Sequence, residues 1–185
     1  MLTSLLNGKR LVLAAAPVAL VMPAPAQADE RAWATASDVA VGSLVAWSVG
    51  GPLVNGDEKG ALQAGLSIAA AQGVTQLLKR LIEKPRPDRS DKRSFPSGHT
   101  ATAFAAASSI MERRGADEGV PALAAAGLVG TARVQARKHD WADVAAGAAI
   151  GTASGVLVTR PRRERLSLAA WGTASGGGLA FSMSF

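Results

Sequence analysis

Successive apolar runs, built mostly from Ala, Gly, Val and Leu and closed by Pro, Gly or clusters of charge, constrain this chain most strongly. Aromatic residues make up only 4% of its 185 residues, and tyrosine is absent. Alternating polar and apolar residues are missing until the last ten positions. Small side chains favour helices that approach one another closely. We therefore expect an all-α fold, a single helical bundle of about five to six helices.

Breaker residues and charge clusters set the expected helix boundaries. The expected helices cover residues 34–54, 61–82, 98–114, 121–137 and 140–159. The connections between them are expected at residues 55–60, 83–93 and 115–119.

The C-terminal residues 176–185 alternate with strand periodicity and end in Phe185. This pattern predicts a short C-terminal strand. It is compatible with the last strand of an outer-membrane barrel, but one strand cannot close a barrel. We therefore favour a strand that docks on the bundle.

The N-terminal segment has the features of a secretory signal. Lys9 and Arg10 precede a short apolar run, and small residues lead to a cleavage site after Ala28. A retained first membrane helix is the alternative, but the run is short for a span. We expect a signal peptide at 1–28, a helical domain at 29–165 with its catalytic core at 61–159, and a tail at 166–185.

The net charge of +6 favours anionic partners: phosphates, anionic lipid surfaces or nucleic acid. Nucleic acid is disfavoured because the basic residues lack interleaved aromatics and the chain carries an export signal. Cysteine is absent, which excludes disulfides and cysteine-based metal sites. Several apolar runs approach the length of a membrane span, but their small residues give weak insertion. Membrane-embedded and compact periplasmic bundles both remain open, and we favour a membrane-associated one.

Three clusters hold residue types that bind and attack phosphate. They are Lys79-x6-Arg86-Pro87, Pro96-Ser97-Gly98-His99 and Arg133-x5-His139-x3-Asp143. The chain has only two histidines, and both lie inside these clusters. Phosphoryl transfer depends on positioning and charge compensation at the phosphate oxygens, which Lys79, Arg86 and Arg133 can supply. Each cation taken alone is more often a solvated side chain.

Ser97 and Gly98 open a helix, where exposed backbone N–H groups bind anions. Ser97 as a simple helix N-cap is the alternative. His139 and Asp143 are four residues apart and share a helical face, so the carboxylate can orient the imidazole. Asp143 acting only on the helix dipole is the alternative there. No metal-ligand set is visible, and the three cations would repel a metal ion.

Taken together and in this order, the three motifs resemble those of the type 2 phosphatidic acid phosphatase family, which shares its fold with vanadium-dependent haloperoxidases and bacterial acid phosphatases. The resemblance covers residues 61–159. One departure is Ala132, where the family usually has Ser before the arginine of the third motif. The resemblance implies a phosphatidic acid phosphatase/haloperoxidase-like bundle.

The resemblance also implies roles for the motif residues. His139 would be the nucleophile that forms a phosphohistidine, Asp143 would orient it, and His99 would protonate the leaving oxygen and later activate water. The phosphate would be bound by Lys79, Arg86, Ser97, Gly98 and Arg133.

The expected function is a metal-independent phosphatase, without a cofactor, that hydrolyses lipid phosphate or pyrophosphate esters at the periplasmic side of the membrane. A soluble periplasmic acid phosphatase with small phosphate ester substrates is one alternative. A non-catalytic module that binds anions or lipids is another. Haloperoxidase chemistry with bound vanadate is the least favoured, because the chain is short for it.

Overall fold

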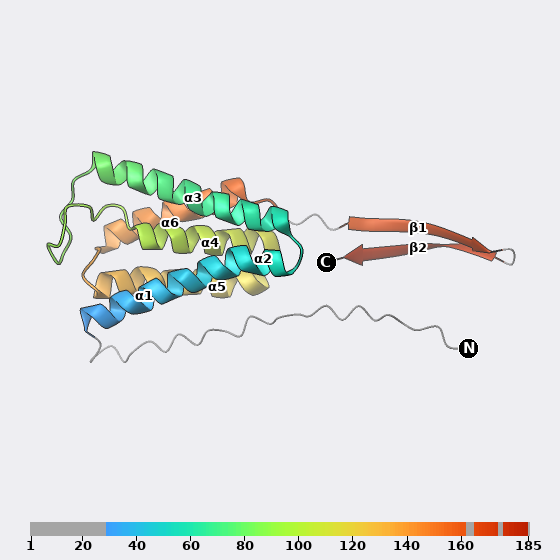
Figure 1. Ribbon diagram of the computed structural model, residues 1–185, viewed down its shortest axis with the longest axis horizontal. Helices are drawn as coiled ribbons and strands as arrows, with labels where there is room; N and C mark the ends of the chain where they lie inside the picture. Colours follow the sequence, from blue (N-terminus) through green and yellow to red (C-terminus); the bar gives the residue numbers. More distant parts are fainter. Residues whose placement is uncertain (1–28, 162–164, 174–175, 185) are drawn as a thin grey trace.

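The computed structural model describes residues 29–161, 165–173 and 176–184. Within these ranges the long helices are α1 (Glu30–Val45), α3 (Glu58–Leu81), α4 (Gly98–Arg114), α5 (Ala116–Gln135) and α6 (Trp141–Val158). A π-helical segment, η1 (Ala46–Gly50), and the short helix α2 (Gly51–Val54) continue the direction of α1. The expected all-α bundle of five to six helices is confirmed (Figure 1).

Helix α4 is the centre of the bundle and contacts α1, α3, α5 and α6. Its central side chains are small and fully buried, as at Ala101, Ala103 and Ala105. A helix with neighbours on every side must present small side chains all round, because the axes otherwise cannot approach closely. Alanine also has the highest helix propensity, so the same residues that permit close packing stabilise the helix itself.

Three glycines place α6 directly against α4. Gly147, Gly151 and Gly155 follow one another at intervals of four and share one face of α6. A Cβ atom on Gly147 would lie 2.5 Å from the carbonyl oxygen of Ser97, and one on Gly151 would overlap the carbonyl oxygen of Ala101. The backbone N–H of Ser97 donates to the carbonyl of Asp143 at 3.0 Å. The packing thus holds the start of α4 beside the first turn of α6.

The connection between α4 and α5 is shorter than expected. The sequence predicted a turn over 115–119 and a helix from Pro121, whereas α5 begins at Ala116 and contains Pro121. Gly115 has a φ of 87°, and this residue reverses the chain alone. Gly119 then packs so closely on α4 that a Cβ atom would lie 2.5 Å from Met111 Cα. The boundary prediction was wrong because one left-handed glycine replaces a longer turn.

The C-terminal residues form a hairpin of two antiparallel strands, β1 (Arg165–Thr173) and β2 (Gly176–Ser184). Strand β2 covers the segment whose alternation predicted a strand. The expectation that this strand docks on the bundle is wrong, because among the described residues its contacts are with β1 and none joins the hairpin to a helix. Strand β1 pairs with β2, so the backbone N–H and C=O groups of β2 find hydrogen-bond partners there and need none from the bundle. The expected signal segment, 1–28, lies outside the described residues.

Two helical stretches are long and apolar enough to cross a membrane by length and composition: Glu30–Val54, with mean hydropathy 1.3, and Trp141–Val158, with mean hydropathy 1.4. Core helices of soluble proteins meet the same criterion. Large apolar side chains are also exposed along the outer face of α3. They are Leu62, Leu66, Val74, Leu77 and Leu81.

Candidate active site

The three sequence motifs meet at one end of the bundle. Lys79 lies in the last turn of α3, His99 in the first turn of α4 and Arg133 in the last turn of α5. His139 lies in the short connection that follows, and Asp143 lies in the first turn of α6. These helix ends lie side by side, next to the long connection from α3 to α4 (Figure 1).

His139 and Asp143 form a buried pair. The imidazole Nδ1 lies 3.5 Å from Oδ2 of Asp143, and the side chains are 3% and 0% exposed. The distance is long for a hydrogen bond, and Nδ1 has no hydrogen-bond partner among the described residues. Because Nδ1 faces the carboxylate, Nε2 on the other side of the ring is turned away from it. The two side chains thus meet across the start of α6; the expectation that they share a helical face is wrong, because His139 precedes the N-cap residue Asp140.

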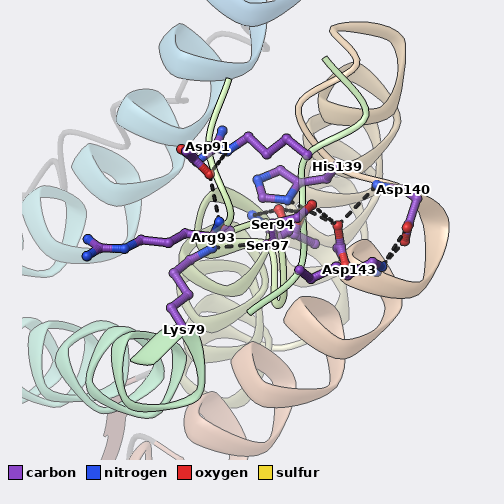
Figure 2. A network of polar contacts seen from close by, with 11 residues as sticks. Lys79, Asp91, Arg93, Ser94, Ser97, His139, Asp140 and Asp143 are labelled. Atoms are coloured by element: carbon purple, nitrogen blue, oxygen red, sulfur yellow. Dashed lines mark hydrogen bonds and ion pairs between the residues drawn. The ribbon is translucent and has the colours of Figure 1, made fainter. Parts of the chain in front are cut away.

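The Asp143 carboxylate is held in place by groups from the loop between α3 and α4 and from the N-cap of α6 (Figure 2). Lys84 Nζ lies 2.7 Å from Oδ1, and Oδ2 accepts from the Ser94 hydroxyl and from the Asp140 backbone N–H. Lys84 also lies 2.5 Å from Oδ2 of Asp140, the N-cap residue of α6. Charge-assisted hydrogen bonds of this kind fix both the position and the ionised form of a buried carboxylate.

The surroundings of His139 keep its imidazole neutral. Burial is the main cause, and the positive charges of Arg133, Lys79 and Arg86 act in the same direction. Together they lower the pKa of His139 to about 4, although the Asp143 carboxylate opposes them. At neutral pH one ring nitrogen therefore carries a free lone pair, and that nitrogen can attack an electrophile.

Lys79 and Arg86 supply two of the positive charges. Lys79 Nζ donates to the backbone carbonyls of Arg93 at 2.6 Å and Ser94 at 3.3 Å. Burial, followed by repulsion from Arg86, lowers the pKa of Lys79 to about 8. Arg86 Nε donates to Asp91 at 2.8 Å, which holds the loop that carries both residues. Both positive charges lie close enough to His139 to lower the pKa of its imidazole.

Arg133 supplies the third positive charge and is nearly buried, with 6% of its surface exposed. Its Nη1 donates to the Ser37 hydroxyl at 3.2 Å and lies 3.6 Å from the Asp38 carboxylate. Burial lowers the pKa of Arg133, and Asp38 opposes that shift. The guanidinium is thus held from α1 while its Nε has no partner among the described residues.

His99 is paired with a residue that lies outside the three sequence motifs. Its Nε2 lies 2.9 Å from Oδ1 of Asp38, on α1. Burial and the Arg133 charge lower the pKa of His99, while the Asp38 carboxylate raises it. Asp38 therefore links the second histidine to the third cation. Its sequence signal was its place as the single charged residue in the apolar run 34–54.

Ser97 and Gly98 begin α4 beside these groups. The Ser97 side chain is fully buried and its hydroxyl accepts from the Thr100 backbone N–H at 3.5 Å, as a helix N-cap residue does. The same hydroxyl forms a 2.9 Å hydrogen bond with the Thr100 hydroxyl. The carbonyl of Gly98 accepts from Gln72 at 3.0 Å. Ser97 therefore caps the helix, the alternative that the sequence left open, and its position still brings the α4 N-terminus to the site.

Three buried polar atoms of the site lack a hydrogen-bond partner in residues 29–161: Thr75 Oγ1, Arg133 Nε and His139 Nδ1. Buried unpartnered polar atoms are rare and costly in folded proteins. Thr75 lies one turn before Lys79 on α3, close to Gly98. The threonine hydroxyl and the arginine N–H are donors, and they accompany three cations. The arrangement therefore suits an anion with several acceptor oxygens, such as a phosphoryl group.

Lys84, Ser94 and Thr75 join the site without a sequence signal of their own. The first two lie in the irregular loop between α3 and α4, and the third lies among the uncharged residues of α3. Within the described part of the chain, no cluster of three His, Asp or Glu side chains is placed to hold a metal ion.

Comparison with known proteins gives three matches. A family model described as the PAP2 superfamily matches residues 60–166. A lipid A 1-phosphatase from Porphyromonas gingivalis is 35% identical over 95 residues, which are 50% of this chain but 21% of that protein. The match therefore spans about a fifth of that curated relative. The crystal structure of LpxE from Aquifex aeolicus is 24% identical, covers 70% of this chain and 84% of that chain, and has a TM-score of 0.60, which shows a common fold.

Proposed function

Because the chain belongs to the PAP2 superfamily, as its three motifs indicated, we propose that it is a metal-independent phosphatase that acts on lipid phosphate or pyrophosphate esters through a phosphohistidine. One observation carries the proposal. The buried imidazole of His139, kept neutral, faces a fixed carboxylate on one side while three cations surround it. That combination provides a nucleophile and an anion site in one place.

In the first half-reaction Nε2 of His139 attacks phosphorus. A P–N bond forms, the ester P–O bond breaks, and the leaving oxygen takes a proton from His99. Lys79, Arg86 and Arg133 compensate the charge on the phosphoryl oxygens. Asp143 stabilises the positive imidazolium that forms at His139. A bound phosphate dianion raises the pKa of His99, because the negative charge favours the protonated ring.

In the second half-reaction water attacks the phosphohistidine. His99, now neutral, takes a proton from that water, the new P–O bond forms, and the P–N bond breaks. Inorganic phosphate leaves, and both histidines return to their starting forms. The geometry supports this division because the two rings belong to different elements that share Arg133 as a charged neighbour.

A lipid substrate is supported by two observations. The similar proteins include a lipid A 1-phosphatase, and α3 and α6 expose large apolar side chains, including Leu81, Trp141 and Leu157. Exposed apolar surface of this extent marks contact with lipid or with another protein. We therefore place the enzyme at a membrane surface, and the predicted export signal places its active site on the periplasmic side.

A substrate panel tests this function. The full chain, in detergent micelles, is assayed for phosphate release from a lipid phosphomonoester, an isoprenoid diphosphate and a small water-soluble ester. We expect turnover of the lipids, unchanged in excess EDTA, and a loss of at least about 10³-fold in His139→Ala. The matched control is Gln135→Ala, an exposed residue at the end of α5. Equal turnover of the soluble ester would favour a non-specific acid phosphatase, and anion binding without turnover would favour a non-catalytic module.

A trapping experiment tests the intermediate separately. With ³²P-labelled substrate and a rapid alkaline quench, we expect acid-labile label on the protein. The label should be absent from His139→Ala, because that variant lacks the attacking nitrogen. Turnover in wild type with label retained in His139→Ala would rule out His139 as the nucleophile.

A further inference from the structure

A basic pocket lies beside the proposed active site, on the side of Lys79. Its volume is about 200 Å³, several times the roughly 30 Å³ share of one water molecule. The lining residues come from the last turn of α3 and from the loop that follows. They are Lys79, Arg80, Glu83, Lys92 and Arg93. We call this the Lys79 pocket.

The Lys79 pocket carries uncompensated positive charge. Glu83 lies 3.9 Å from Lys92, and both side chains are about three-quarters exposed, so this pair is weak and lies at the rim. Across residues 29–161 no carboxylate pairs with Arg80 or Arg93. Four cations and one carboxylate therefore line the cavity, and that carboxylate, Glu83, makes only the weak pair at the rim. Because no carboxylate pairs with Arg80 or Arg93, the net positive charge of the cavity favours a bound anion.

The pocket and the active site are neighbouring compartments that share Lys79. The ammonium group of Lys79 contacts the carbonyls of Arg93 and Ser94, and Ser94 in turn donates to Asp143. In Figure 2 the Arg93 side chain extends from this stretch of backbone away from the imidazole of His139. A group in the pocket therefore lies next to the reacting phosphate without contacting the nucleophile.

We infer that the Lys79 pocket binds a second phosphate group of the substrate, so that the preferred esters carry two phosphate groups. This rests on the proposed phosphatase function and adds the substrate class to it. Arginine side chains suit such a group because the planar guanidinium binds two phosphate oxygens at once. The second group is either the adjacent phosphate of a diphosphate or a separate phosphate on the same lipid headgroup.

Two substrate pairs distinguish these sources. One pair is an isoprenoid monophosphate and the diphosphate of the same alcohol. The other pair is a lipid headgroup with one phosphate and the same headgroup with two separate phosphates. We expect wild type to prefer the doubly phosphorylated member of one pair by about tenfold or more in kcat/KM, since a single hydrogen bond to a charged group has that effect. The pair that shows the preference identifies the source.

Variants of the pocket test its role. In Arg80→Gln/Arg93→Gln the ratio of kcat/KM for the doubly and singly phosphorylated substrates should fall about tenfold. The matched control is Arg89→Gln, an exposed arginine of the same loop that does not line the pocket. An unchanged ratio in the double variant, or a wild type without preference in both pairs, would overturn the inference.

A binding measurement keeps the two proposals separable. Calorimetry on the His139→Ala protein compares pyrophosphate with orthophosphate and needs no turnover. We expect pyrophosphate to bind about tenfold more tightly, and Arg80→Gln/Arg93→Gln to remove the difference. Equal affinities would contradict a pocket for an adjacent phosphate, whatever the activity. Tight pyrophosphate binding in a protein that never releases phosphate would instead contradict the phosphatase function alone.

Discussion

The carboxylate of Asp38 lies 2.9 Å from Nε2 of His99 and 3.6 Å from the guanidinium of Arg133. One residue of α1 thus orients the proposed acid and a phosphate-binding cation. In Asp38→Asn the pKa of His99 should fall further, because the carboxylate that raises it is lost. We expect kcat to fall about tenfold or more, a part of the 10²–10⁴-fold that a positioned acid–base group provides. The His99 ring proton signals in NMR give the pKa.

Glu30→Gln is the matched control for this change. Glu30 lies on the same helix and pairs only at the surface, 3.7 Å from Arg137. Its removal should leave both kcat and the His99 pKa unchanged. An Asp38→Asn protein with a normal His99 pKa and normal kcat would show that the Asp38 contact has no role in the reaction.

Lys84 should stabilise the fold as well as the site. Lys84→Gln removes a cation from the fully buried Asp143 carboxylate, and an undersatisfied buried group costs about 1–3 kcal/mol. Urea denaturation should show this loss, and kcat should fall because the carboxylate is no longer fixed. Lys84→Arg should recover much of both. Lys59→Gln, an exposed lysine in the first turn of α3, is the control, and an equal effect there would argue against the Lys84–Asp143 pair.

The pKa of Lys79 predicts an alkaline limit to activity. Burial lowers that pKa to about 8, so the free enzyme loses this positive charge as the pH rises through 8. Because kcat/KM reports groups of the free enzyme, its value should decline above this pH. In Lys79→Arg the decline should move to higher pH, since arginine stays charged. A decline at the same pH in Lys79→Arg would assign it to another group.

Stability should fall in acid because of His139. Its folded-state pKa of about 4 lies below the ordinary value of 6.5, so the unfolded chain binds more protons between these values. The free energy of unfolding therefore decreases as the pH is lowered from about 6.5 towards 4. In His139→Gln this pH dependence should be weaker, which chemical denaturation at several pH values can measure. A stronger dependence in the variant would reverse the sign proposed here.

Gly151 is expected to tolerate no side chain. In Gly151→Ala the new Cβ atom would overlap the carbonyl of Ala101, and overpacking of this kind typically costs about 1–3 kcal/mol. Gly127→Ala on α5 is the control, because its Cβ atom meets nothing within 4 Å. That change should stabilise the protein by about 0.5–1 kcal/mol through better helix propensity. Thermal unfolding of the two variants should therefore shift in opposite directions.

Much of the helical architecture could be predicted from the sequence, because small-residue runs and breakers mark helices locally. The motif spacing also predicted that His139 lies near Asp143, but the contact forms across the capped start of α6 and not along a helical face. Asp38, Lys84 and Ser94 could not be assigned this way. Each meets its partner only through tertiary packing, across 61, 59 and 49 residues of chain. The start of α5 was missed because Pro121 resembled a helix boundary. The chain instead reverses at Gly115, and its positive φ cannot be read from the residue type alone.

The close seating of α6 on α4 also affects how the protein can diversify. The contact surface of glycine and alanine leaves no room for a larger side chain inside the bundle. Mutations there destabilise the fold, so they are lost before they can change which substrate the protein binds. The irregular stretch between α3 and α4 carries Glu83, Lys92 and Arg93 of the Lys79 pocket, and these three side chains are exposed. Relatives that accept different molecules should therefore differ mainly in that stretch, and directed evolution of selectivity is best confined to it.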